Sequence, residues 1–544
     1  MKNSIKICLL FFAFASQLSY AQEEGNLGSE DIIVVKDYEA RIVDAEKIKI
    51  NPNIPEIETE KLVLEYNVPS KLLELNYPPH TLKPYSMPKV KSETFNDSYI
   101  RLGFGTQFSP LAEVVYMNDD VKNTVFGAYY KHLSAYGKTD NQKFRDNDLG
   151  TFVKYYLKKT ELGANFNFTQ NQDYFYGYNH ADTSFTSKEI NHRLREIGGS
   201  LYLKNAGLNE KNFDHFQELS TSFTNDNFDV NEWFVNYKVK FTKVNKNKHF
   251  FNVIGEMDFS NYIPSAPGRG DLEREIFWFG GDYTFNNDDW KLTAGIVGAA
   301  GDINDEQQFN VYPKLYTEKR LYKNFLIFYS GWSRRLQKNT YLNFASENPY
   351  INSDIMLENS RIEDRMAGFK GSVDKFSYNA RFSNKVIKQM PIYVNDSTDM
   401  KRFNIVYDKN TTVININLEG AYAWNNKLRS VLNFDFMLYE PDGLEKAWHL
   451  PMINTNFSTS YLLKEKLLMK AEIFGLAGAF AQDENGNAQK IKGMVDINLG
   501  AEYQFTKYLS FFAQLNNLAN FKYQNWYNYP TFGFNGMVGV QFRY

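Results

Sequence analysis

The histidines are the residues best suited to catalysis or metal binding, but their spacing is unfavourable for both. The chain of 544 residues has seven histidines, and none forms a His-Glu-x-x-His pattern. No nucleophile elbow or phosphate-binding loop occurs either. His180 and His192 flank a long expected loop, so a Ser/His or Asp/His pair there is the enzymatic alternative. We expect solvated histidines, no catalytic residue and no metal site. The seven are His80, His132, His180, His192, His215, His249 and His449.

Two further segments carry residue types that could bind a ligand. The run from Asp483 to Asn487 offers alternating oxygen ligands for calcium, but it lacks the bidentate Glu of an EF-hand loop. An Asn-Gly turn is the favoured interpretation. Arg269, Gly270 and Asp271 match a cell-adhesion tripeptide, and we interpret them as a turn as well.

A group of aromatic residues marks the expected loop 170–190. Exposed aromatic rings can stack on sugars or other flat ligands. The alternative, which we favour, is an aromatic girdle or contact with surface lipid. The aromatic residues are Tyr174, Phe175, Tyr176 and Tyr178, followed by His180.

The first 21 residues have the pattern of a cleaved signal peptide. Lys2 and Lys6 precede a short apolar run, and a small-x-small site ends at Ala21. The single cysteine, Cys8, lies inside this segment. We therefore expect an exported chain without disulfides or thiolate metal sites, and we expect no cofactor.

Composition excludes several classes of protein. Aromatic residues make up 16% of the chain, and the mean hydropathy is -0.50. After the signal segment we find no apolar run of about twenty residues, which a membrane-spanning helix needs. The net charge of -3 argues against nucleic acid as a partner.

The C-terminal strand is the clearest structural signal. From residue 531 onward apolar residues fall on even positions, and the chain ends on an aromatic residue. A strand with period two has one apolar and one polar face, as outer-membrane β-barrels require. Similar terminal strands serve as the recognition signal for the barrel-assembly machinery. We therefore predict Phe542 and Tyr544 as this assembly signal, and outer-membrane lipid as the surroundings.

Alternation of this kind persists through residues 98–544, and the connections alternate between short and long. We predict a transmembrane antiparallel β-barrel of about 22 strands, with both ends in the periplasm and the long loops outside. Short connections are expected at 506–507, 464–465, 425–426, 374–375, 286–289 and 245–247. Long connections are expected at 520–530, 482–489, 334–362, 261–271 and 170–190.

Residues 22–97 differ in composition from the barrel. Seven prolines lie close together, and proline removes a backbone donor and fixes φ. We expect a largely extended segment, either periplasmic or inserted into the lumen. The prolines are Pro52, Pro55, Pro69, Pro78, Pro79, Pro84 and Pro88.

Two motifs in the barrel region resemble those of TonB-dependent receptors. Residues 516–520 and Tyr523 are similar to the Asn-Leu-x-Asn/Asp-x-x-Tyr signature near the end of those receptors. Residues 348–351, 357–360 and 368–371 are similar to their Asn-Pro-x-Leu-x-Pro-Glu loop and the following Gly-Phe-Lys strand, although the Pro-Glu pair is absent. The resemblance implies a barrel that moves or admits a ligand of unknown identity. A complete plug domain does not fit within residues 22–97.

A short N-terminal run resembles the TonB box, through which these receptors pair with an energising partner by strand addition. It consists of Asp31, Ile32, Ile33, Val34 and Val35. An ordinary periplasmic strand remains open as an alternative. At the level of the whole chain, the competing function is a non-transporting partner barrel of an envelope complex, sealed by its own N-terminal segment.

Overall fold

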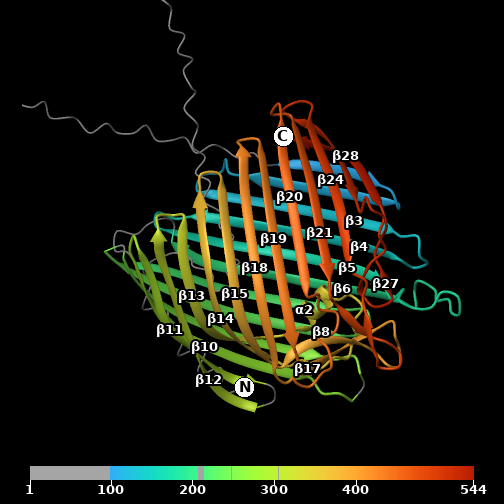
Figure 1. The fold of residues 1–544 in the computed structure, drawn as a ribbon, viewed down its shortest axis with the longest axis horizontal. Helices are drawn as coiled ribbons and strands as arrows, with labels where there is room; N and C mark the ends of the chain where they lie inside the picture. The colour runs from blue at the N-terminus through green and yellow to red at the C-terminus, as the bar shows by residue number, and fades with distance from the viewer. Residues whose placement is uncertain (1–97, 206–212, 247, 267, 304–305) are drawn as a thin grey trace, which may run out of the picture. The chain divides into compact units, whose positions relative to one another are not determined.

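Twenty-two antiparallel strands form one closed sheet in the computed structural model, which describes residues 98–205, 213–246, 248–266, 268–303 and 306–544 (Figure 1). The strands of the wall are β1 (Tyr99–Gly105), β2 (Ser109–Asn118), β3 (Thr124–Tyr136), β4 (Lys143–Tyr156), β5 (Thr160–Tyr174), β6 (Asn191–Asn205), β7 (Phe213–Asn225), β8 (Asn231–Asn245), β9 (His249–Ile263), β10 (Leu272–Asn286), β11 (Trp290–Ile303), β12 (Glu306–Tyr322), β13 (Leu326–Gln337), β14 (Ser360–Val373), β15 (Phe376–Lys388), β18 (Thr411–Asn425), β19 (Leu428–Glu440), β20 (Ile453–Leu463), β21 (Leu467–Ala477), β24 (Met494–Gln504), β25 (Leu509–Asn516) and β28 (Asn535–Arg543).

The remaining described elements belong to connections between wall strands. They are the helix α2 (Tyr341–Glu347) and the small hairpins β16 (Met390–Asn395) with β17 (Phe403–Asp408), β22 (Phe480–Gln482) with β23 (Ala488–Lys490), and β26 (Gln524–Trp526) with β27 (Tyr529–Pro530). None of the described helical residues forms a helix long and apolar enough to cross a membrane.

The first and last strands close the barrel. β1 pairs with β28 in antiparallel register, with Tyr99 opposite Arg543 and Ile100 opposite Phe542. Every other wall strand pairs with its neighbours along the chain, so every strand has a partner on both sides. The prediction of about 22 strands starting near Ser98 is confirmed. The start of β1 and the end of β28 lie at the same rim.

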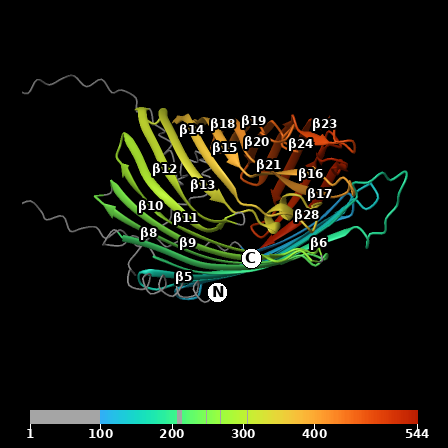
Figure 2. The ribbon, with the colours of Figure 1, turned by 90° about the horizontal axis from the view of Figure 1, so that it is seen from below.

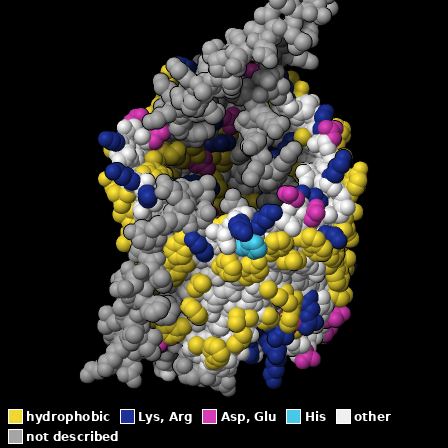
Figure 3. All heavy atoms as spheres, turned by 90° about the vertical axis from the view of Figure 1, so that its left-hand side faces the viewer, with side chains coloured by type: hydrophobic (Ala, Val, Ile, Leu, Met, Phe, Trp, Pro, Cys, Tyr) yellow, Lys and Arg dark blue, Asp and Glu magenta, His cyan; other side chains and the backbone are white. Residues whose placement is uncertain are grey.

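Alternation along the strands separates an apolar outer face from a polar inner face. In β28 the side chains of Val538, Val540 and Phe542 are exposed, whereas Met537 and Gln541 are buried. Figure 3 shows hydrophobic side chains spread over the outer wall of one face, with charged side chains mainly at its borders. This is the pattern that a wall between lipid and water requires.

The inner face carries ion pairs between wall strands that are separated by one intervening strand. Lys314 lies 3.1 Å from Asp282, and Lys370 lies 2.9 Å from Glu318. Because buried polar groups need partners, these cross-strand pairs indicate a polar lumen rather than a packed core.

Connections of different length lie at the two rims. All six short connections that the sequence predicted join strands at the rim where β1 begins, which we call the short-turn rim. All five predicted long connections lie at the opposite rim, which we call the long-loop rim. The signal segment and residues 22–97 fall outside the described residues, so the predictions for them are untested.

Candidate functional site: the loop cap at the long-loop rim

Five connections at the long-loop rim share one hydrophobic core, and we call this assembly the loop cap. They are 175–190, 226–230, 338–359, 389–410 and 517–534. Figures 1 and 2 show α2 and β17 gathered at this end of the barrel. Loops that only extended into solvent would not bury large aromatic residues. The core consists of Tyr176, Leu194, Val230, Tyr262, Tyr341, Phe344, Ala345, Ile351, Ile355, Leu357, Tyr393, Phe403, Ile405 and Tyr529.

The helix α2 is fixed at its N-terminus by a carboxylate from the barrel wall. Thr340 caps the helix, since its side chain accepts a hydrogen bond of 3.1 Å from the backbone N–H of Asn343. Glu232 on β8 accepts two more, from the N–H groups of Tyr341 at 3.2 Å and Leu342 at 3.1 Å. A negative charge is favourable there because the first N–H groups of a helix have no partner within it.

A buried arginine links the same carboxylate to both ends of the 338–359 connection. Arg274 on β10 lies 3.7 Å from Glu232, and both side chains are 4% exposed. The guanidinium also donates to the carbonyl of Asn339 at 2.8 Å and to the side chain of Asn359 at 3.1 Å. Removing either partner would leave an uncompensated buried charge, so the pair holds the loop to the wall.

A second anchor joins the 226–230 turn to the helix. Asp226 accepts a hydrogen bond of 2.7 Å from the hydroxyl of Tyr341, and His192 Nε2 lies 3.5 Å from the same carboxylate oxygen. Its other oxygen accepts from the N–H groups of Phe228 and Val230. Burial alone would raise the pKa of Asp226, but the hydrogen bonds from His192 and Tyr341 hold that pKa below its usual range. The charged carboxylate therefore stabilises the closed cap.

His192 and Asp226 form an Asp/His pair of the kind raised by the sequence, and their contacts are structural. A Ser/His contact also occurs, since Ser134 Oγ lies 3.3 Å from His132 Nε2. The ring of His192 is buried and donates from Nδ1 to the carbonyl of Pro349 at 2.6 Å. Phe175 stacks on one side of the imidazole, at a centroid distance of 5.5 Å. Both ring nitrogens of His192 make contacts and the ring is covered. The His192–Asp226 pair therefore holds loops in place.

The expectation of solvated histidines is wrong for three of them. His192, His215 and His449 are buried. The rings of His192 and His449 pack against aromatic residues, and His215 Nδ1 lies 3.2 Å from Asn205 Oδ1 on the neighbouring strand. The expectation for the aromatic loop is also wrong at two positions. Phe175 and Tyr176 are buried in contacts with other loops, so they are available neither to an external ligand nor to lipid.

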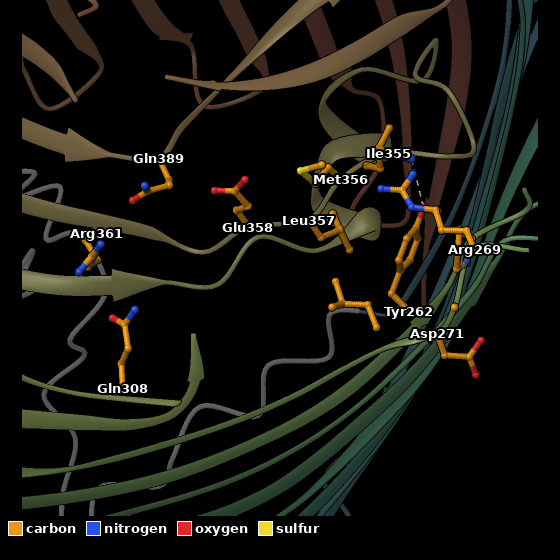
Figure 4. Close-up of a pocket in the computed structure, with 13 residues that line it drawn as sticks. Tyr262, Arg269, Asp271, Gln308, Ile355, Met356, Leu357, Glu358, Arg361 and Gln389 are labelled. Carbon is orange, nitrogen blue, oxygen red and sulfur yellow. Dashed lines mark hydrogen bonds between the residues drawn. The ribbon is translucent and has the colours of Figure 1, made fainter. Parts of the chain in front are cut away.

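A cavity of about 460 Å³ opens beside the cap, between the 264–271 connection and the end of the 338–359 connection (Figure 4). Arg361, Gln308 and Gln389 lie at one end of it, and Arg269 and Asp271 lie at the other. The lining is mixed in polarity, with Ile355, Met356 and Leu357 between the two polar ends. Such a space could hold a small polar molecule below the cap.

The two expected turns are confirmed. Arg269 sits in a turn closed by its N–H to the carbonyl of Ala266, and its guanidinium pairs with Asp354. The carboxylate of Asp483 accepts hydrogen bonds from the backbone N–H groups of Asn485 and Asn487 at 2.9 and 2.8 Å. Within the described ranges no group of three His, Cys, Asp or Glu residues is arranged to hold a metal ion.

The motifs that resemble receptor signatures lie in the cap and its supports. Asn348 is fully buried and accepts from the N–H of Tyr350, whose ring stacks on Tyr529 at a centroid distance of 3.6 Å. Asn517 begins the last long connection, and its amide donates to the carbonyls of Phe521 at 2.7 Å and Phe532 at 3.0 Å. Sequence reasoning located both motifs but not their role in tying loops together.

The predicted assembly residues lie at the seam of the barrel. Phe542 and Tyr544 are exposed on the outer face, near the short-turn rim. The TonB-box-like residues Asp31 to Val35 fall outside the part of the chain that the structure describes. Both assignments stay predictions.

A closed 22-stranded barrel with an apolar exterior, a polar lumen and long loops at one rim defines a class of fold, that of TonB-dependent receptors. The chain is similar to the FrpB iron transporter of Neisseria meningitidis, at 11% identity and a TM-score of 0.65, with 83% of this chain and 82% of that chain covered. It is also similar to the siderophore receptor PirA of Acinetobacter baumannii, at 8% identity and a TM-score of 0.63, covering 82% and 81%.

A third similar structure is a variant of the ferric enterobactin receptor PfeA of Pseudomonas aeruginosa, at 11% identity and a TM-score of 0.62, covering 82% and 80%. No protein-family model and no curated protein matches the sequence. At these identities the likeness is one of fold, which does not carry a ligand with it.

Proposed function

We propose that this chain is an outer-membrane barrel of TonB-dependent-receptor type that admits a ligand through its lumen, with the loop cap as its outer gate. The observation that carries the proposal is the 22-stranded wall, apolar outside and polar inside, which shares its fold with siderophore receptors and an iron transporter. A lumen lined by cross-strand ion pairs provides a hydrated route through lipid.

The orientation follows from the connections. Barrels of the bacterial outer membrane have short periplasmic turns and long external loops. The loop cap then faces outward, and the chain enters and leaves the barrel on the periplasmic side. The signal segment 1–21 accounts for export, and the barrel-assembly machinery accounts for insertion.

Ion conductance in a planar bilayer tests the gate. The wild-type barrel should conduct weakly, because the loop cap covers one rim. Glu232→Gln should raise conductance, since it leaves Arg274 buried without a charged partner and weakens the hold on α2. Glu465→Gln, an exposed position at the short-turn rim, is the matched control and should conduct like the wild type.

A specific observation favours a second candidate function. The loop cap has a hydrophobic core of its own, which suits a permanently sealed barrel that serves as a structural partner in an envelope complex. If neither the wild type nor Glu232→Gln conducts, while both insert and fold, the gate is refuted and the structural partner is favoured.

Energy coupling is a separate part of the proposal. If residues 31–35 act as a TonB box, Ile33→Pro removes one backbone donor and fixes φ, which breaks strand addition without touching the wall. Uptake should be lost at normal barrel levels, and crosslinking of TonB to residues 31–35 should disappear. Ile33→Val, which keeps the backbone donor, should behave like the wild type. Equal uptake by both variants would refute coupling through this segment.

A further inference from the structure

The wall is incompletely paired between two of its strands, in the half next to the long-loop rim. β12 pairs with β11 as far as Glu306, but it pairs with β13 only as far as Lys314. β13 continues to pair with β14 up to its last residue, Gln337. Residues 306–313 of β12 and 334–337 of β13 therefore have no described partner across the gap, which we call the seam. Figure 1 shows the long-loop end of β12 standing apart from β13.

The backbone groups that face the seam follow from one hydrogen bond at the other end of β12. The N–H of Arg320 donates to the carbonyl of Asp289, on the β11 side, at 2.8 Å. Successive residues of a strand direct their backbone groups to opposite neighbours, so even-numbered residues of β12 face β11 and odd-numbered residues face the seam. Phe309 and Val311 therefore direct N–H and C=O into the seam, where no described residue pairs with them. Pro313, next in this odd-numbered series, has no N–H to extend the ladder.

The seam lies within the apolar outer band of the wall. The side chains of Phe309 and Val311 are 71% and 53% exposed. Val311 lies in one cross-strand row with Phe279, because both are opposite Gly298, and Phe279 is 61% exposed. Lipid hydrocarbon offers no hydrogen bonds, so an uncovered sheet edge is costly at this level. The backbone groups in the seam therefore require a cover that supplies hydrogen-bond partners at the spacing of a strand.

Three kinds of cover can be compared on physical grounds. An acyl chain of a lipid has no donor or acceptor, so it would leave Phe309 and Val311 unpaired. A second copy of the chain would be related by a two-fold axis along the membrane normal, because both copies have the same orientation in the membrane. Barrel strands tilt by about 35–45°, so the two copies of β12 would cross at about 70–90°, which is too steep for a ladder. An extended segment of another protein can run alongside β12 and pair with it by strand addition.

The two faces of such a segment would meet different surroundings. Its outer face would continue the apolar band beside Phe309 and Val311. Its inner face would border the cavity of about 460 Å³ beside the loop cap, which is lined by Gln308 of β12 and Arg361 of β14 (Figure 4). The segment therefore needs apolar residues on one face and polar residues on the other, as a strand with period two provides.

Two arginines make the inner side of the seam positively charged. Arg361 Nε is buried without a partner, and no described carboxylate forms an ion pair with this guanidinium. Arg335, exposed at the free end of β13, has no described ion-pair partner either. Such cations favour acidic side chains opposite them. We propose that the seam binds, by strand addition, an extended segment of another envelope protein whose residues alternate between apolar and acidic.

This inference goes beyond the proposed function, because it depends on the wall and not on the passage of a ligand. Synthetic peptides test it on the purified full chain in lipid nanodiscs, with binding measured by fluorescence anisotropy. A labelled nine-residue peptide that alternates valine and glutamate should bind saturably. The same peptide with lysine for glutamate should bind at least about ten-fold more weakly, because it meets the arginines with like charge. A peptide of the same composition without the alternation should not bind.

Backbone methylation separates strand addition from simple charge attraction. N-methylation of all the glutamates removes the N–H groups from one edge of the peptide, and N-methylation of all the valines removes them from the other edge. At least one of these two peptides should bind at least about ten-fold more weakly, since one edge of the segment pairs with β12. Unchanged binding by both peptides would mean that no backbone pairing occurs and would overturn the proposal.

Photocrosslinking locates the bound peptide. The crosslinker p-benzoylphenylalanine in place of Val311 should capture the glutamate peptide. The same crosslinker in place of Phe166, an exposed residue of the outer wall on β5, is the matched control and should not capture it. If position 311 crosslinks only to phospholipid or only to a second copy of the chain, the seam belongs to that occupant and the proposal is wrong.

Charge reversal tests the inner side of the seam. Arg335→Glu/Arg361→Glu should invert the preference, so that the lysine peptide binds more tightly than the glutamate peptide. Lys188→Glu/Lys490→Glu, at two exposed positions of the long-loop rim, makes the same change in net charge and should keep the wild-type preference. Heat-modifiable migration in electrophoresis confirms that each variant is folded. No saturable binding by the folded wild type, or the same preference in both double variants, would refute the seam site without bearing on conductance through the lumen.

Discussion

Mild acid should open the loop cap through His449. This residue lies in the connection between β19 and β20, is 6% exposed, and packs its ring against Phe403 and Trp526. Its Nδ1 donates to the carbonyl of Tyr393 at 3.1 Å, whereas Nε2 is buried without a partner. Burial lowers the pKa of His449 to about 4, because a charged imidazole at this place would lose its water.

The sign and size of the effect follow from the two pKa values. In the open cap His449 would have a pKa of about 6.5, above its value in the closed cap, so the open state binds more protons. The stability that neutral His449 contributes is fully present above pH 6.5 and is lost as pH falls toward 4. At pH 5 the loss is about 2 kcal/mol, which corresponds to an increase of about 30-fold in the population of the open cap.

Hydrogen–deuterium exchange on the full chain measures this opening. Backbone amides of the β16–β17 hairpin should lose protection between pH 7.5 and 5, after correction for the intrinsic exchange rate. Hydrogen bonds from Thr398 outweigh burial and lower the pKa of Asp396 to about 2, so this neighbouring carboxylate does not titrate in that interval. His449→Gln keeps a donor for the Tyr393 carbonyl and cannot titrate, so it should show a flat profile. The same pH dependence in this variant would refute the role of His449.

Three further predictions concern the wall. Deleting residues 542–544 removes Phe542 and the pair between Arg543 and Tyr99 from the closing seam, so little heat-modifiable protein should accumulate in the outer membrane; normal accumulation would refute the assembly role. A cysteine at Asn485, in an exposed turn of the long-loop rim, should react with an impermeant maleimide on intact cells, whereas one at Asp288 should not; the reverse result would invert the topology. Gly368→Ala would place a Cβ 2.5 Å from the carbonyl oxygen of Ala380. The free energy of unfolding should therefore fall by about 1–3 kcal/mol, which the denaturant midpoint measures. Gly420→Ala, whose Cβ would meet only Phe376 at 3.6 Å, is the control, and equal midpoints would contradict the packing argument.

The wall could be predicted because its signals are local. Period-two alternation in β28 and short turns such as the one after Val373 depend on a few adjacent residues, and the sequence shows them directly. Closure of the barrel could be predicted from the even number of strands and from the alternation of short and long connections. Of the site, sequence reasoning located the long connections and two of their motifs, and it identified the turns at Arg269 and Asp483.

The loop cap could not be predicted because its contacts join residues far apart in the sequence. Tyr176, Tyr341 and Tyr529 lie in three different connections, and none has a periodic pattern around it that would indicate burial. In the alternation pattern of their strands, Glu232 and Arg274 do not differ from other residues that face the lumen. Only the register between β8, β9 and β10 brings them to the same helix terminus. Whether aromatic residues in a loop are buried or exposed therefore cannot be predicted until the neighbouring loops are known.

The receptor-like motifs and the unpaired groups of the lumen lie in different parts of this barrel. Asn348 Oδ1 accepts from the backbone N–H of Tyr350, and the amide of Asn517 donates to two backbone carbonyls, so both residues serve to build the cap. Unused donors and acceptors that face the lumen lie on Arg381, Asn433 and Asn454 of the wall. Because an interaction already satisfied within the protein cannot discriminate between ligands, selectivity has to reside in groups of this second kind. Under the proposed function, a chain with the same cap and a different set of lumen-facing residues on β15, β18, β19 and β20 should therefore fold in the same way and select a different ligand.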